Sequence, residues 1–231
     1  NKDFIMNKKL LIGCLSLALS PITYALESPI NGTYIGMTFG TTYIPPIQDI
    51  NSSLNSTILS DATLLTITPS IGADFGFQIG RRFNDRYRIE TEFLGAYAGL
   101  REITFSTSDT TGYNVEGYIS TYLSLFLNAY IDLLPSKGDY RATSPYFGIG
   151  IGKAYTVLQT ELHLNDSYVG NIVKSKESVS VVQAIFGISY FLDDYTSMGI
   201  DFRLQKYGQL SYTGQSYYQN ALNFTVKTTL E

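Results

Sequence analysis

The sequence is poor in the residues that most enzymatic metal and thiol sites require. Its 231 residues include one cysteine, one histidine and no tryptophan, and only 16% of them are charged. One cysteine cannot form a disulfide within the chain, and together with one histidine it cannot supply a multi-ligand zinc site. The formal net charge is −4 and the basic residues are scattered, so no basic patch points to nucleic acid. We therefore expect no metal, no cofactor and no nucleic-acid partner.

Apolar and aromatic residues, by contrast, are abundant. Hydrophobic residues make up 44% of the chain, and there are 20 Gly, 19 Tyr and 13 Phe. This content is too apolar for a disordered chain and indicates a folded protein with a large buried or lipid-facing surface.

The first 25 residues have the organisation of a secretory signal peptide. Lys8 and Lys9 precede an apolar run at 10–19, and Ala25 provides the small residue before a cleavage point. The run is shorter than the roughly 20 residues of a transmembrane helix. We expect residues 1–25 to be removed and the segment 1–5, which precedes Met6, to be a spurious leader.

A lipoprotein signal is the alternative, because Leu11-Ile12-Gly13-Cys14 could place a lipid on Cys14. Only seven residues separate Met6 from Cys14, and the apolar run continues past the cysteine. The signal-peptide interpretation is favoured, and it leaves residues 26–231 as one domain without cysteine.

Strict alternation of apolar with small or polar residues, the period of a β-strand, recurs along that domain. The alternating segments are 33–40, 67–80, 87–97, 122–131, 145–152, 180–190, 198–205 and 221–228. Long segments rich in Ser, Thr and Asn separate them at 41–65, 100–117, 157–178 and 208–219. The other connections are shorter and centre on 84–85, 135–143 and 193–194. Long loops that alternate with shorter turns are typical of an antiparallel meander through an outer membrane.

The two faces of these strands decide between a soluble and a membrane barrel. One face carries nearly all the strand charges, and the other is almost uncharged. A soluble barrel places its charges outside, whereas lipid requires an uncharged outer face, where a cation at the midplane costs about 2–4 kcal/mol. The sequence predicts an all-β fold, an eight-stranded antiparallel up-and-down transmembrane β-barrel.

The charged face predicts a network inside the barrel, because buried charges need opposite partners. Its expected members are Asp74, Arg88, Glu90, Glu92, Asp201, Arg203 and Lys227. Glu90 and Glu92 are adjacent on this face and could instead share a proton or a metal. An eight-stranded barrel is just wide enough to be filled by side chains, so a structural network is favoured, with a gated small-solute pore as the alternative.

Tyrosines mark the expected membrane boundaries. Tyr87 and Tyr97 lie ten residues apart on the outward face, which corresponds to roughly 33 Å of strand and, after tilting, to the roughly 25 Å height of the apolar band. We expect both in aromatic girdles. Further strand-end tyrosines support this prediction: Tyr34, Tyr43, Tyr118, Tyr146, Tyr155, Tyr190, Tyr207 and Tyr218.

Several strand motifs resemble those of the OmpA-like, opacity-type surface-antigen barrels of Gram-negative bacteria. They are the segments 86–93 (RYRIETEF), 128–132 (NAYID), 144–152 (SPYFGIGIG) and 183–190 (QAIFGISY). The resemblance spans the chain after the signal peptide and implies an outer-membrane barrel with variable loops. One departure is the end Thr229-Leu230-Glu231, where such chains usually carry a final aromatic residue; Leu230 keeps the outward register of Phe224 and Val226.

Two patterns that could carry chemistry have simpler explanations. The glycines of 148–153 (GIGIGK) resemble a phosphate-binding loop, but they alternate within a strand and no helix follows. His163, with Asp166 and Ser167, could form a nucleophilic set, but all three lie in one polar segment that we expect to be an exposed loop. The sequence therefore predicts a protein that is not an enzyme.

These inferences predict a surface protein of the outer membrane that displays four extracellular loops, with an antigenic, adhesive or envelope-structural role. Recognition is expected in the loops 41–65, 100–117 and 157–178. The alternative function is a small porin with a narrow, charge-gated lumen. The resemblance implies contact with outer-membrane lipid, periplasmic chaperones and the barrel-assembly machinery, a host or surface ligand bound by the loops, and a monomeric state.

Overall fold

The computed structural model describes residues 32–50, 65–83, 86–105, 113–133, 143–164, 167–193, 195–211 and 215–230. The expected signal peptide and its cleavage point at Ala25 lie outside these residues. Within them the regular secondary structure is β-strand, and none of them belongs to a helix long and apolar enough to cross a membrane.

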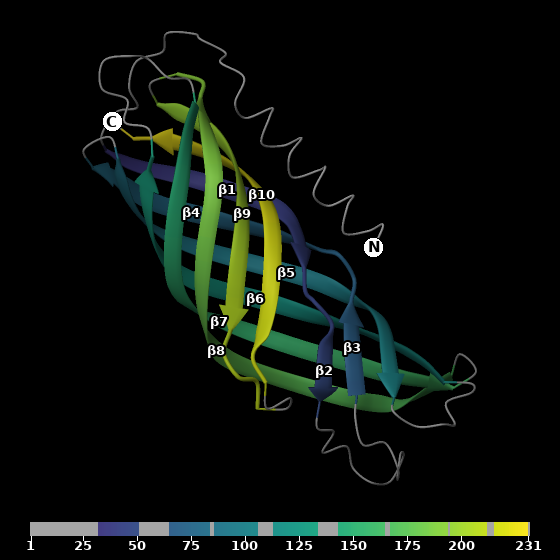
Figure 1. Ribbon diagram of the computed structural model, residues 1–231. Helices are drawn as coiled ribbons and strands as arrows, with labels where there is room; N and C mark the ends of the chain where they lie inside the picture. Colours follow the sequence, from purple (N-terminus) through teal and green to yellow (C-terminus); the bar gives the residue numbers. More distant parts are fainter. Residues whose placement is uncertain are drawn as a thin grey trace, which may run out of the picture.

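Ten strands form one sheet. They are β1 (Thr33–Tyr43), β2 (Ile47–Ile50), β3 (Leu65–Pro69), β4 (Gly72–Phe83), β5 (Tyr87–Phe105), β6 (Tyr113–Asp132), β7 (Thr143–Leu164), β8 (Ser167–Phe191), β9 (Thr196–Tyr207) and β10 (Tyr217–Thr229). Each long strand pairs antiparallel with its neighbours, β1 pairs with β10, and β5 pairs with β6, so the sheet closes on itself (Figure 1). The predicted closed eight-stranded antiparallel barrel is confirmed.

The two additional strands come from one division and one insertion. The predicted strand 67–80 is divided at Ser70 and Ile71 into β3 and β4, and both parts pair with β5. Ser70 continues the contact by donating its N–H to the carbonyl of Gly99 at 2.7 Å. The short β2 lies inside the segment 41–65, which we expected to be a loop, and pairs with β3.

The prediction of a loop over 157–178 is wrong. Strand β7 continues to Leu164 and β8 begins at Ser167, and the two pair up to Leu164 opposite Ser167, with register shifts after Thr160 and after Leu162. Antiparallel pairing satisfies the backbone groups of this hairpin, so a segment rich in polar residues can still form strands, which the composition did not predict. Likewise, within the predicted loop 100–117, β5 continues to Phe105 and β6 starts at Tyr113.

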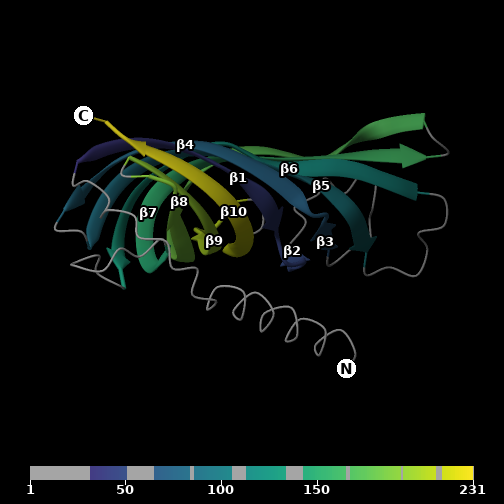
Figure 2. The same cartoon turned by 90° about the horizontal axis from the view of Figure 1, so that it is seen from above.

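These longer strands project from one end of the barrel. Strand β8 pairs with β9 only from Val181 onward, and β6 pairs with β5 only up to Tyr118 opposite Gly99. The segments beyond form a three-stranded β6–β7–β8 extension, which reaches farthest at the lower right of Figure 1 and at the right of Figure 2. We call this end the rim. The opposite end, where β1 begins, β10 ends and β8 turns into β9, is the turn end.

The outer surface is apolar, as the alternation predicts. Large apolar side chains from all the long strands are exposed, among them Phe39, Phe77, Leu127, Ile151 and Leu222. The side chains at the intervening positions are buried, and most of them are polar or charged. The molecule thus reverses the arrangement of a soluble barrel, which is what a lipid environment requires.

Candidate functional site

The interior is divided into two layers along the barrel axis. The charged layer is nearer the turn end and comprises Asp74, Arg82, Arg88, Glu90, Glu92, Asp132, Asp201, Arg203 and Lys227, all buried. The apolar layer is nearer the rim and comprises Ile44, Ile47, Leu94, Ala98, Ile119, Phe126, Ala154, Leu158, Val179, Val181, Tyr207, Leu210 and Tyr217. All seven charged residues expected in the lumen therefore lie together in the charged layer.

Lys227 and Glu90 form one centre of the charged layer. The Nζ of Lys227, on the last strand, lies 2.7 Å from Glu90 Oε2 on β5. The hydroxyls of Tyr34 and Tyr130 donate to the two oxygens of the same carboxylate, at 3.0 and 2.9 Å. Lys227 Nζ also lies 5.2 Å from the centre of each tyrosine ring, within range of a cation–π interaction. This pair is thus surrounded by aromatic rings and satisfied by direct hydrogen bonds.

Arg203 forms the second centre. Its Nη1 lies 2.7 Å from Glu92 Oε1 and its Nε lies 2.7 Å from Asp201 Oδ1. Asn128 links the two centres, because its amide nitrogen donates to Glu92 at 3.0 Å and to Glu90 at 3.4 Å. Glu90 and Glu92 therefore bind different cations, and this geometry supports the structural network over a shared metal or proton.

Asp74 is buried beside this second centre. When the amide nitrogen of Asn223 faces Asp74, it donates to Asp74 Oδ2 at 3.1 Å, and its oxygen accepts from Arg203 Nε at the same distance. Asn223 then connects Asp74 to the Arg203 centre.

A third centre, which was not predicted from the sequence, lies at the turn end. Asp132 accepts from Arg82 and from Arg88, each at 2.9 Å. The guanidinium of Arg88 also lies over the rings of Tyr130 and Tyr146, at 4.7 and 4.5 Å. Arg82 and Asp132 both continue the inward alternation of their strands, just beyond the predicted strand ends. Extending the alternation by one or two residues would have predicted that both side chains lie in the lumen.

Glycines make room for the tyrosines inside the barrel. Tyr34 is paired across the ladder with Gly80, Tyr130 with Gly148, and Tyr146 with Gly187. A Cβ atom added at any of these glycines would collide with the ring of the paired tyrosine. The glycines of the segment 148–153 therefore lie in strand β7 beside lumenal side chains, which is not the backbone of a phosphate-binding loop.

The tyrosines divide between the two faces of the barrel. Tyr87 and Tyr97 are 50% and 55% exposed on the outer face, and Tyr43, Tyr155 and Tyr218 are exposed as well. Tyr34, Tyr146 and Tyr207 are buried inside, so their assignment to a girdle is wrong. Their positions have the parity of the lumenal residues, and the strand alternation overrides their aromatic character. Tyr190 is half-buried, and the side chain of Tyr118 lies outside the described residues.

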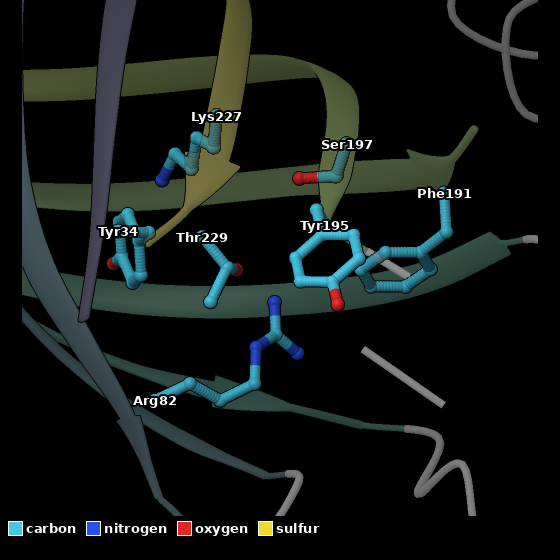
Figure 3. Close-up of a pocket in the computed structure, with 7 residues that line it drawn as sticks. All are labelled: Tyr34, Arg82, Phe191, Tyr195, Ser197, Lys227 and Thr229. Carbon is cyan, nitrogen blue, oxygen red and sulfur yellow. The ribbon is translucent and has the colours of Figure 1, made fainter. Parts of the chain in front are cut away.

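A small indentation opens at the turn end of the interior. It is lined by Tyr34, Arg82, Phe191, Tyr195, Ser197, Lys227 and Thr229 (Figure 3). Figure 3 shows the guanidinium of Arg82 reaching from β4 into this space, with Tyr195 and Thr229 facing it. The charged layer can therefore be approached from this end.

The apolar layer closes the interior toward the rim. The rings of Tyr207 and Tyr217 stack with centroids 4.4 Å apart and planes tilted by 11°. Ile44 and Ile47 from the segment after β1, and Leu210 from the segment after β9, pack into the same cluster. The alternation of the strands did not predict this layer, because the segment after β1 and the segment after β9 contribute part of it.

The described part of the chain also bears on the two disfavoured chemistries, a metal site and a set around His163. No group of three or more His, Cys, Asp or Glu residues there could hold a metal ion. His163 belongs to strand β7, opposite Asn114 and Tyr168, so the expectation that it lies in a loop is wrong. Asp166 lies outside the described residues.

Asp193 organises the turn between β8 and β9, outside the barrel strands. Its Oδ1 accepts the backbone N–H groups of Tyr195 at 2.8 Å and Thr196 at 2.6 Å. These backbone hydrogen bonds favour the ionised form and lower the pKa of the Asp193 carboxyl.

Comparisons with known proteins agree with this architecture. A family model described as the outer membrane protein beta-barrel domain matches residues 11–229. Neisserial surface protein A is similar in structure, with 12% identity and a TM-score of 0.50 over 86% of this chain and 97% of that one. The outer membrane protein OprG of Pseudomonas aeruginosa has 14% identity and a TM-score of 0.51 over 88% and 100%. At these identities the likeness concerns the fold alone. No curated protein sequence matches the chain.

Proposed function

Because the chain belongs to the family of outer-membrane β-barrel proteins, we propose that it is a surface protein whose barrel presents the β6–β7–β8 extension and its neighbouring segments for recognition. Its location is the outer membrane. In such barrels the short turns face the periplasm and the long connections face the cell exterior. The rim is accordingly the exterior end, and the turn end with Asp193 is the periplasmic end.

The observation that carries this proposal is the length of β7 and β8. They have 22 and 25 residues, whereas β9 and β10 have 12 and 13. About 9–11 residues suffice for a tilted strand to cross a membrane. The excess forms a paired sheet beyond the barrel, and an ordered sheet presents side chains for binding at a lower entropic cost than a free loop.

The interior supports the same proposal. Hydrogen bonds and ion pairs in the charged layer connect side chains from β1, β5, β6, β9 and β10. A filled interior gives a rigid scaffold, and binding surfaces are commonly displayed on such scaffolds. The proposed role is antigenic, adhesive or envelope-structural, and it requires no catalytic chemistry.

Two experiments test this proposal. We expect the protein to stay with the membrane fraction at high salt and to require detergent for extraction; release by salt alone would contradict it. We also expect cells that express the protein to bind a host or envelope ligand, and deletion of residues 160–173 to abolish this binding. Deletion of 212–214, in the connection between β9 and β10, is the control. Binding that survives the first deletion and is lost with the second would place recognition elsewhere.

A narrow pore is the second candidate function. It is favoured by the indentation at the turn end, which gives access to the charged layer through Lys227 and Arg82. Conduction would also require the side chains of the apolar layer to move apart and open a path to the rim. Planar-bilayer recordings should then show discrete conductance that changes with Glu90→Gln or Arg203→Ala, and silence at all voltages would exclude this function.

We propose that the protein is not an enzyme. The alternative is a lipid-modifying hydrolase. His163 is the chain's only histidine, so the test needs one variant. An unchanged lipid profile in cells that express the protein or its His163→Ala variant is expected, and a change in lipid acylation that depends on His163 would contradict this part of the proposal.

A further inference from the structure

The segment that follows β9 folds inward over the barrel end. After Tyr207 the chain leaves the strand, and Leu210 turns into the apolar layer, where its side chain is only 1% exposed. The next residue, Ser211, is exposed again. The Leu210 side chain is thus buried in the apolar layer, while the residue that follows it lies at the surface.

Hydrogen bonds to β8 hold this segment in place. The backbone N–H of Ser211 donates to Glu177 Oε2 at 2.7 Å, and the Ser211 hydroxyl donates to the same oxygen at 2.8 Å. At the other end of the segment, the N–H of Gly208 donates to the carbonyl of Ser180 at 2.8 Å. Glu177 is 34 positions away from Ser211 in the sequence, so these bonds join the segment after β9 to strand β8.

The site of Gly208 shows how closely the segment approaches β8. A Cβ atom there would lie 3.2 Å from the Ser180 carbonyl oxygen and 4.0 Å from Val179 Cβ. The first contact is tighter than ordinary van der Waals packing, so a side chain at this position would push the segment away from β8. Glycine permits the segment to lie flat across the end of the apolar layer.

We propose that residues 208–211 form a lid that closes the exterior end of the apolar layer, and that the hydrogen bonds from Ser211 to Glu177 are the latch that holds the lid shut. The latch is exposed, so water can replace its hydrogen bonds at a small net cost. Leu210, by contrast, gains by staying buried. The lid is therefore closed at rest and can open without disturbing the charged layer beneath it.

Cysteine labelling tests the lid directly. In a Cys14→Ser background, Leu210→Cys is the only cysteine, and Ser216→Cys provides an exposed control on the same connection. With the latch intact, a membrane-impermeant maleimide should label Leu210→Cys at least about tenfold more slowly than Ser216→Cys, because the burying contacts must open first.

Breaking the latch should remove this protection. Glu177→Ala is expected to accelerate labelling of Leu210→Cys about tenfold, and Ser211→Ala, which keeps the backbone donor, should have a smaller effect. Lys176→Ala is the matched control on the same strand and should leave the rate unchanged. Far-UV circular dichroism verifies that each variant retains the barrel. Equal labelling of Leu210→Cys and Ser216→Cys in the latched protein, or no acceleration by Glu177→Ala in a folded barrel, would overturn the proposal.

Discussion

Lys227 and Glu90 are 137 positions apart in the chain, yet Lys227 Nζ lies 2.7 Å from Glu90 Oε2 inside the barrel. The pair connects the last strand, β10, to β5, which is not one of its ladder neighbours. It therefore spans the lumen, and it can form only when the barrel has closed in the correct register.

Removing one member of this pair should leave the other as an unpaired buried charge. We expect Glu90→Gln to lower the free energy of unfolding by about 3–5 kcal/mol. The double variant Glu90→Gln/Lys227→Met should lose less of the free energy of unfolding than Glu90→Gln alone, because it leaves no unpaired ammonium group buried. Urea unfolding in lipid vesicles measures both, with Lys176→Met on the exposed extension as control. A double variant as unstable as the sum of the two single variants would argue against direct coupling.

The pairing of lumenal tyrosines with glycines leads to a steric prediction. In Gly148→Ala the new methyl group collides with the ring of Tyr130, and such overpacking costs about 1–3 kcal/mol. Gly99→Ala is the matched control, because its Cβ would meet only the Ser70 hydroxyl oxygen, at 3.2 Å, a side-chain atom that can rotate away, whereas the contact at Gly148 is with an aromatic ring. The same vesicle unfolding assay compares the two, and equal stabilities would contradict the role assigned to the glycine.

Much of this architecture can be predicted from the sequence, because a lipid-facing surface imposes an alternation on every strand. The alternation at 87–97 correctly separates Glu90 and Glu92 from Phe93 and Tyr97. The same alternation places Tyr34 in the lumen, because Tyr34 shares the parity of Gly36 and Thr38. Its aromatic character suggested an aromatic girdle instead.

Other features depend on information that the pattern of single strands does not hold. Which cation binds Glu92 is decided by the register and tilt of the barrel, which bring Arg203 across from 111 positions away. The segments near Leu164 and Ser167 are rich in polar residues, and their composition alone does not show that they pair as strands. The apolar layer needs Ile44 and Leu210, which lie in connections and not in a periodic segment.

The lipid-facing surface should tolerate a charge at its edge but not at its middle. Phe77 and Ile71 both point outward, 53% and 74% exposed, Phe77 within β4 and Ile71 just before the strand begins. We expect Phe77→Arg to cost about 2–4 kcal/mol and Ile71→Arg about 0–1 kcal/mol in lipid vesicles, because the penalty falls with distance from the bilayer midplane. Equal penalties would mean that the apolar belt is not centred on β4 as described.

Asp193 should make the stability of the β8–β9 turn depend on pH. Its pKa is lowered in the folded protein, so its contribution is fully present above the pKa of the unfolded chain, about 4, and is lost as the pH falls through the lower folded value. The difference in urea midpoint between the parent protein and Asp193→Ala should therefore shrink as the pH is lowered below about 4. A constant difference across this range would show that the hydrogen bonds to Tyr195 and Thr196 are not linked to ionisation.

The central claim is that alternate residues of each strand face lipid and a filled interior. A scan of single cysteines from Tyr87 to Ala98 on β5, each carrying a spin label in lipid vesicles, tests it most directly. Odd positions such as 89, 93 and 97 should be accessible to a lipid-soluble relaxing agent, whereas even positions such as 90, 92 and 94 should be protected from both lipid-soluble and water-soluble agents. High access of the water-soluble agent at the odd positions, or no alternation along the strand, would contradict the account.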